Sequence, residues 1–174
     1  MQSIIEKMRE MEIKLLIIEY NKASQLDRSL SKTNLSAAKK NKFRKYLLDY
    51  CMELMKKIDD GILKNNEIRD KIRELKNIDN AISFGQAQKV INVCLKQYCF
   101  ITKNEKMIKE LDCPLDTITM NGYGIKNKRM IQINEADYIR YQEKFYEENN
   151  GLRILKDCEY DENRIKQFIT AGDI

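Results

Sequence analysis

The sequence SFGQAQKVINVCLKQYCFI, residues 83–101, has the pattern of an α-helix that is apolar around most of its circumference. Ser83 is placed to cap this helix, because its hydroxyl can accept a hydrogen bond from a backbone N–H of the first turn. A helix with so little polar surface packs on several sides, so we expect residues 83–101 to be a buried central helix. Its apolar stripe consists of Ala87, Val90, Ile91, Cys94, Leu95, Tyr98 and Ile101. Its only clear polar edge consists of Gln88, Lys89, Asn92 and Lys96.

Length and composition favour one helical domain over residues 1–174. The chain has one proline and six glycines, and so few helix breakers argue for long helices rather than a sandwich or barrel. We therefore predict a mainly α, single-domain bundle of about six to seven helices around residues 83–101, with a minor strand pair as an open alternative. The chain has no histidine, so it lacks the commonest general base and the commonest metal ligand.

The remaining helices are predicted from apolar periodicity and from residues that can cap a helix. The predicted segments are 2–22, 36–58 with Ser36 as the cap, 66–77, a short helix over 104–113 that Pro114 stops, 134–148 with Asn134 as the cap, and a last helix that begins at Asp161. In the first segment we group Ile5, Met8, Ile13, Leu15, Leu16, Ile17, Ile18 and Tyr20 on one widened apolar face. Three short stretches stay open to an extended conformation: 15–18 (LLII), 130–134 (MIQIN) and 152–160 (LRILKDCEY).

Five cysteines are present, an odd number with no C-x-x-C spacing. We interpret them as reduced residues, mostly in the core, of a cytoplasmic protein. The N-terminal twenty residues carry charges throughout their apolar run, which is typical neither of a signal peptide nor of a membrane span. We therefore expect no membrane partner.

Charge is distributed unevenly over a chain whose formal net charge is +5. Residues 35–58 hold seven basic and two acidic side chains, whereas residues 135–174 hold six basic and ten acidic ones. This distribution predicts one basic end and one acidic end. A homo-oligomer in which the two ends pair between copies stays open.

The strongest candidate for a binding surface is a run of five cations within seven residues: Lys39, Lys40, Lys42, Arg44 and Lys45. They wrap around the first two turns of a predicted helix, where positive charge opposes the helix dipole. Contact with phosphate groups would account for them, and Tyr46 or Tyr50 could stack on bases if exposed. The alternative is a solvated lysine-rich face.

A second candidate surface lies at the start of the central helix, at Gly85, Gln86 and Lys89. Glycine has no side chain, so a ligand or another backbone could approach closely there. Unpaired N–H groups at a helix start also favour an anion or a polar partner. The alternative is that Gly85 permits tight packing between segments.

Candidates for chemistry are few. Asp112 and Asp116, with Glu105 nearby, could hold a divalent metal in an enzyme that acts on nucleic acid, although the strand context usual for such sites is missing. Cys113 lies between these aspartates, and neighbouring carboxylates raise the pKa of a thiol, which opposes its reactivity. We expect no catalytic residue, no bound metal and no cofactor.

Four segments of the chain are similar to segments of a known group of proteins: SFGQAQKVIN, LKQYC, CPLD and EADYIRYQEKF. Over Ile82 to Tyr146 the chain resembles a loose, uncharacterised family of small helical proteins from prokaryotes and phages. These proteins share a glycine–x–alanine–glutamine–lysine start to a core helix, a cysteine–proline–hydrophobic–aspartate turn and a tyrosine-rich helix. Many of them carry tryptophan and histidine in these stretches, and this chain has neither. The resemblance implies a fixed core helix and a mobile-element origin, and it carries over no catalytic residue.

Together these observations predict a non-catalytic binding module that engages a host protein or nucleic acid. An inhibitor of a bacterial defence system fits that class. The alternative is a metal-dependent enzyme acting on nucleic acid.

Overall fold

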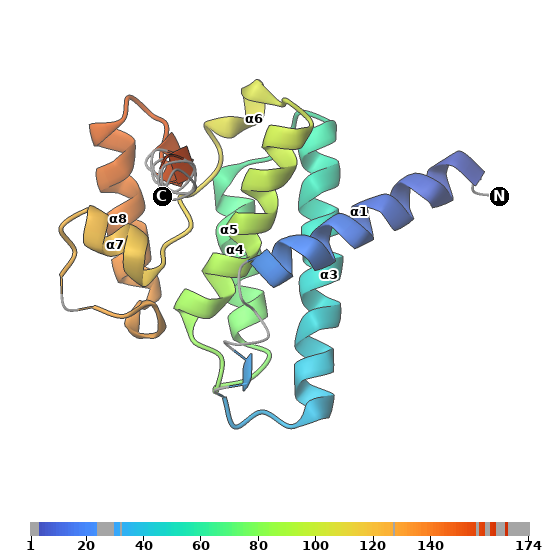
Figure 1. The fold of residues 1–174 in the computed structure, drawn as a ribbon, viewed down its shortest axis with the longest axis horizontal. Coiled ribbons are helices and arrows are strands. Elements are labelled where there is room, and N and C mark those ends of the chain that lie inside the picture. The colour runs from blue at the N-terminus through green and yellow to red at the C-terminus, as the bar shows by residue number, and fades with distance from the viewer. Residues whose placement is uncertain are drawn as a thin grey trace, which may run out of the picture.

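The structure is a computed structural model that describes residues 4–23, 30–31, 33–126, 128–155, 157–158, 161–162 and 166. These residues form seven α-helices and one 3-10 helix, and they include no strand (Figure 1). The helices are α1 (Ile4–Ala23), α3 (Ala37–Asp59), α4 (Asn65–Lys76), α5 (Phe84–Ile101), α6 (Glu105–Ile108), α7 (Thr117–Gly122), η1 (Met130–Gln132) and α8 (Glu135–Glu148). The mainly α prediction is confirmed. The extended alternative for residues 15–18 is wrong, because they lie within α1.

Helix α5 is the central element, as predicted. It contacts α1, α3, α4, α6 and η1, and Figure 1 shows it in the middle of the molecule. Its N-terminus begins with a reciprocal pair of hydrogen bonds between Ser83 and Gln86, in which each side chain accepts from the other residue's backbone N–H. Ile91, Cys94 and Leu95 are fully buried. The predicted stripe is wrong only at its end, since Ile101 is 56% exposed where the last turn leaves the core.

Helices α3 and α4 pack on α5 and on each other. The Ser36 hydroxyl caps α3 by accepting from the Lys39 N–H at 3.4 Å. The inward-facing residues of α3 are Phe43, Leu47, Cys51, Leu54, Met55 and Ile58. Tyr46 follows the same helical period, but it lies at the edge of this stripe and is 36% exposed. It is therefore available on the surface beside the basic run.

Helix α1 packs on α3 and α5 through one side of its C-terminal half. Ile17 and Tyr20 are buried there, and Ile13 and Leu16 are partly buried against the same core. The other members of the widened face, Ile5, Met8, Leu15 and Ile18, are exposed, so the prediction of a single apolar face is wrong. Figure 1 shows the N-terminal half of α1 extending past α3, away from the rest of the molecule.

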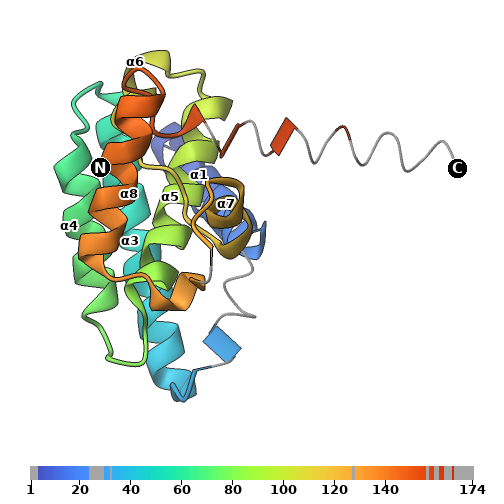
Figure 2. The same ribbon diagram turned by 90° about the vertical axis from the view of Figure 1, so that its left-hand side faces the viewer.

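The chain between α6 and α7 runs as a buried, non-helical segment, residues 111–116, between α5 and α8 (Figures 1 and 2). The sequence predicted a helix up to residue 113, but α6 ends at Ile108. Leu111, Cys113 and Leu115 are buried with Pro114 between them. Proline disfavours a helical conformation of Cys113, the residue before it, but it does not account for the end of α6 five residues earlier.

Helix α8 begins as predicted, since the Asn134 side chain accepts from the Asp137 N–H at 2.8 Å. Residues 130–132 are the 3-10 helix η1 rather than an extended piece. Described residues 155, 157 and 158 are helical, so the strand alternative for 152–160 is wrong there. The helix predicted from Asp161 lies largely outside the described residues. Among the helices that the structure describes, none combines the length and apolarity needed to span a membrane.

Candidate functional site

The basic run forms an exposed surface at the start of α3, which we call the α3 basic face: Lys39, Lys40, Lys42, Arg44 and Lys45. All are exposed except Lys40, which is half-buried. Lys39 pairs with Asp79 at 2.6 Å, and this hydrogen bond lowers the pKa of the Asp79 carboxyl below its usual range. Within the described part of the chain, no carboxylate forms an ion pair with Lys40, Lys42 or Lys45. The first turn of α3 contains no acidic residue to offset the positive charge.

A hollow of about 380 Å³ adjoins the α3 basic face. It is lined by Lys42, Tyr46, Tyr50, Glu74, Asn77 and Ile78. The Tyr46 and Tyr50 rings are 5.7 Å apart at a tilt of 49°, and the Lys42 ammonium lies 5.7 Å from the Tyr46 ring. Burial and the neighbouring Glu74 raise the pKa of Tyr50 above its ordinary value. The structure thus places an exposed aromatic ring and cations side by side.

The second predicted surface, at the start of α5, is occupied by the chain itself. Gly85 is buried, and a Cβ atom there would lie 1.9 Å from the carbonyl oxygen of Met130 in η1. Gln86 belongs to the cap of α5, and the Lys89 ammonium lies 3.2 Å from Asp116. The glycine therefore serves a close approach between two backbones, the alternative that the sequence left open.

The polar edge of α5 is buried rather than exposed, and it holds the 111–116 segment. The side-chain amide of Gln88 donates to the carbonyl oxygen of Leu115, and its oxygen accepts from the Leu115 N–H at 3.0 Å. From the other side, the Gln142 amide of α8 donates to the Cys113 carbonyl and accepts from the Cys113 N–H, both at 2.8 Å. Two glutamines thus supply the backbone hydrogen bonds that a strand would receive from its neighbours.

A chain of buried hydrogen bonds continues from Gln88 to a carboxylate. The Asn92 amide donates to the Gln88 oxygen at 3.2 Å and to the Tyr138 hydroxyl at 2.8 Å. Tyr138 in turn donates to Asp112 at 2.8 Å. Asp112, whose side chain is fully buried, also accepts from Arg69 at 3.0 Å. The guanidinium supplies the countercharge that a buried carboxylate requires.

Lys96, one turn beyond Asn92, completes the buried polar edge. Its side chain is 4% exposed, and its ammonium donates to Asp157 and, at 2.7 Å, to Asp161. Burial opposes the charged form, but the two carboxylates outweigh it and raise the pKa of Lys96. The pKa of Asp157 is also raised, mainly by burial. This ion pair ties the chain after α8 to the central helix.

The two aspartates considered as metal ligands are engaged separately by protein donors. Asp112 is held by Arg69 and Tyr138, as described above. Asp116 accepts from the Thr119 N–H at 2.8 Å at the start of α7. Burial would raise the pKa of Asp116, but the Thr119 N–H and the Lys89 ammonium lower it overall. Among the described residues, no three histidine, cysteine, aspartate or glutamate side chains gather in a geometry that could hold a metal ion.

The cysteines lie as the sequence predicted. Cys51, Cys94, Cys99 and Cys113 are buried free thiols, and Cys158 is partly buried. Burial, with the nearby Asp157, raises the pKa of Cys113 well above its ordinary value. A thiol in that environment stays protonated and unreactive at neutral pH.

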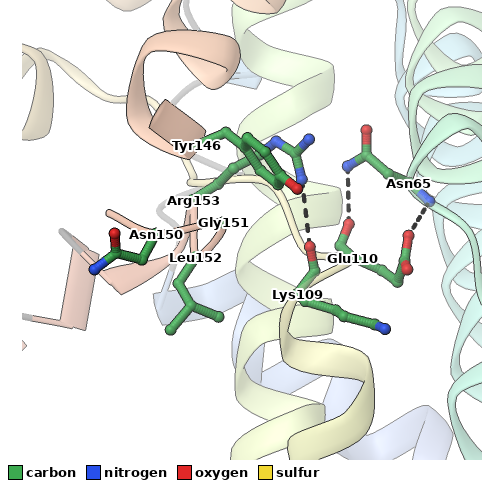
Figure 3. A pocket seen from close by; sticks show the side chains of 8 residues that line it. All are labelled: Asn65, Lys109, Glu110, Tyr146, Asn150, Gly151, Leu152 and Arg153. Atoms are coloured by element: carbon green, nitrogen blue, oxygen red, sulfur yellow. Dashed lines mark hydrogen bonds between the residues drawn. The ribbon is translucent and has the colours of Figure 1, made fainter. Parts of the chain in front are cut away.

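A larger hollow, of about 600 Å³, lies where the start of α4 meets the end of α8 (Figure 3). The polar residues that line it contact one another. On one wall, Arg153 lies 4.4 Å from the Tyr146 ring and donates to the Lys109 carbonyl at 3.3 Å. On the opposite wall, Asn65 donates from its backbone to the Glu110 carboxylate at 3.1 Å and from its side chain to the Glu110 carbonyl at 2.8 Å. These contacts crosslink three segments, so we interpret this hollow as a structural junction.

In comparisons with known proteins, no family model matches the chain, no curated protein is significantly similar to it in sequence, and no solved structure is significantly similar to it in fold.

Sequence reasoning found the α3 basic face but missed the buried polar edge of α5. Gln88, Asn92 and Lys96 recur every four residues on a helix whose other residues are mostly apolar. That combination was a usable signal, because a helix enclosed on all sides must also bury its polar side chains. Buried polar groups then require partners from distant segments.

Proposed function

We propose that this chain is a non-catalytic module that binds single-stranded nucleic acid through the α3 basic face and Tyr46. The observation that carries the proposal is the cluster of Lys40, Lys42 and Lys45, which have no ion-pair partner in the described part of the chain, beside an exposed tyrosine. Cations that follow a sugar–phosphate backbone, with an aromatic ring on which a base stacks, are the usual elements of single-strand binding.

Two features favour a strand over a small ligand or an acidic protein. The cations wrap around two turns of α3 rather than converging on one point, which suits a series of phosphates. The hollow beside Tyr46 and Tyr50 also offers room for a base next to the positive surface. In the cell, such a module would suit the role expected from the resemblance, an inhibitor of a bacterial defence system.

The geometry favours binding over metal-dependent cleavage. Asp112 and Asp116 are held by different protein donors, in a buried network and at a helix start respectively. A magnesium ion at Asp112 would have to displace the half-buried Arg69 guanidinium, which would then keep only the exposed Glu143 carboxylate as a partner. We therefore assign neither aspartate a role in catalysis.

The test is fluorescence anisotropy with a labelled single-stranded oligonucleotide at several salt concentrations. Lys42→Ala/Arg44→Ala/Lys45→Ala is expected to weaken binding at least tenfold and to flatten the salt dependence, since each lost phosphate contact lowers the slope by about 0.7. The matched control is Lys103→Ala/Lys106→Ala/Lys109→Ala, which removes the same charge from exposed lysines around α6 and should bind normally. Tyr46→Ala should weaken binding several-fold.

Three results would overturn the proposal. They are the absence of binding by the unmodified protein at low salt, equal losses in the two lysine variants, and magnesium-dependent cleavage of the oligonucleotide that Asp116→Ala abolishes. The third result would favour the alternative function, a metal-dependent enzyme acting on nucleic acid.

A further inference from the structure

Helix α1 has a second apolar face that the described part of the chain leaves exposed. The face consists of Ile4 at 78% exposure, Met8 at 64%, Met11 at 63%, Leu15 at 61% and Ile18 at 46%. The intervals along it are four, three, four and three residues, which is the heptad spacing of a coiled-coil seam. We call these five residues the α1 seam. Isolated exposed apolar residues are common on proteins, but a continuous row of this kind indicates an interaction surface.

The seam lies on the side of α1 opposite to its contact with the molecule. In heptad notation, Met8 and Leu15 occupy a positions, and Ile4, Met11 and Ile18 occupy d positions. The residues that contact the rest of the chain fall at the outer b, c and f positions. Arg9 pairs with Asp59 at 2.9 Å, and the apolar members of this group are Ile13, Leu16, Ile17 and Tyr20. A second helix can therefore lie along the seam without meeting the body of the same molecule.

The charges beside the seam identify the occupant and its direction. On one flank, the g positions are Lys7 and Lys14. On the other flank, the e positions include Glu12 and Glu19. In a parallel pair of identical helices, each g residue faces the e residue five positions later on the other helix. Lys7 then faces Glu12, and Lys14 faces Glu19, in both directions across the pair. An antiparallel pair would oppose lysine to lysine and glutamate to glutamate.

We infer that two copies of this chain associate through a parallel coiled coil formed by their α1 seams. Leu15 at a with Ile4 and Ile18 at d favours more than two strands, but larger assemblies would bury the charged e and g side chains further, and we take this charge to limit the assembly to two. A membrane surface fits less well, since interfacial helices have lysine- and arginine-rich polar faces and here one flank is acidic. Lys14 also pairs with Glu10 within its own helix, so the flanking charges mainly set orientation while the apolar seam supplies the association.

The first test is sedimentation equilibrium of the full chain over a range of concentrations. The unmodified protein is expected to show a concentration-dependent dimer, and Met11→Glu/Leu15→Glu should be monomeric. Ile62→Glu is the control, because Ile62 is also 58% exposed but lies in the turn after α3; this variant should still dimerise. A monomer at every concentration, an assembly larger than a dimer, or a dimer that survives Met11→Glu/Leu15→Glu would overturn the inference.

The second test examines direction and keeps the seam intact, so it stands even if the seam variant fails to fold. In the swapped variant Lys7→Glu/Glu12→Lys/Lys14→Glu/Glu19→Lys, g and e exchange sign. It is expected to dimerise with itself but not with the unmodified chain, because the mixed parallel pair opposes like charges. Native mass spectrometry of an equimolar mixture at low salt, with the swapped chain labelled with 15N because the swap leaves the mass unchanged, should show only the two homodimers. Abundant mixed dimers would overturn the parallel arrangement. Because neither test involves nucleic acid, this inference and the proposed function can fail independently.

Discussion

Gln88 of α5 and Leu115 of the 111–116 segment are joined by two hydrogen bonds, one to each polar group of the Leu115 backbone. Gln142 repeats the arrangement at Cys113. Residues 113–115 lie buried between two helices, where no water can replace these bonds. The two glutamine side chains therefore allow a non-helical segment to cross the interior without leaving these backbone groups unpaired.

The first prediction concerns Gln88. Gln88→Leu keeps the approximate volume but leaves the N–H and C=O of Leu115 without partners. At about 1–3 kcal/mol for each unsatisfied buried group, we expect the free energy of unfolding to fall by about 3 kcal/mol. Urea denaturation followed by circular dichroism measures it. The control is Gln97→Leu, since Gln97 is half-buried on the same helix, and it should change stability by less than about 0.5 kcal/mol. Equal effects would refute the role given to Gln88.

The second prediction concerns the close approach at Gly85. Gly85→Ala introduces a methyl group 1.9 Å from the backbone carbonyl oxygen of Met130, and neither backbone can move without disturbing α5 or η1. We expect the free energy of unfolding to fall by about 3 kcal/mol, at the upper end of the range for overpacking. Gly122→Ala is the control, because a Cβ there meets nothing within 4 Å. The measurement is the melting temperature of each variant. Equal values for Gly85→Ala and Gly122→Ala would contradict the close contact between the backbones at Gly85 and Met130.

The elements that could be predicted from the sequence are those fixed by neighbouring residues. Ser36, Ser83 and Asn134 act as caps as predicted, because a cap depends on residues within one turn. Helical periodicity likewise gave the bounds of α3, α4 and α8 within one or two residues. Proline at 114 was predicted to stop the preceding helix, although that helix ends earlier than expected.

The parts that could not be predicted depend on distant partners. The spacing of Gln88, Asn92 and Lys96 signals their burial, but nothing local specifies that the 111–116 segment and α8 cover that side of α5. The same holds for α1. Its adjacent residues Ile17 and Ile18 are buried and exposed respectively, because only one side of the helix packs on the rest of the molecule. For the candidate binding surface, the cations were evident from the sequence, but the exposure of Tyr46 required the structure.

A third prediction is the pH dependence of the Asp116 contribution. Its pKa in the folded protein lies below the usual 3.8, so its carboxylate stabilises the fold above that pH and ceases to do so as pH falls through the folded value. Asp116→Asn keeps an acceptor for the Thr119 N–H but removes the charge facing Lys89. We expect it to cost about 1 kcal/mol at neutral pH, with the difference from the unmodified protein shrinking below pH 3.8.

The measurement is a set of denaturation curves from neutral pH down to acidic pH. Asp49→Asn serves as the control for the loss of one aspartate charge, because Asp49 is exposed on α3. A stability difference for Asp116→Asn that grows on acidification would have the wrong sign and would contradict the assignment.

The most direct test of this account is amide hydrogen exchange at Cys113 and Leu115, measured by NMR. If glutamine side chains hold these backbone groups in the interior, both amides should exchange about as slowly as that of Ile91 in α5, close to the rate of global unfolding. In Gln88→Leu, protection should fall at Leu115 more than at Cys113. Exchange at both positions as fast as at Asn80, in an exposed turn, would contradict the account.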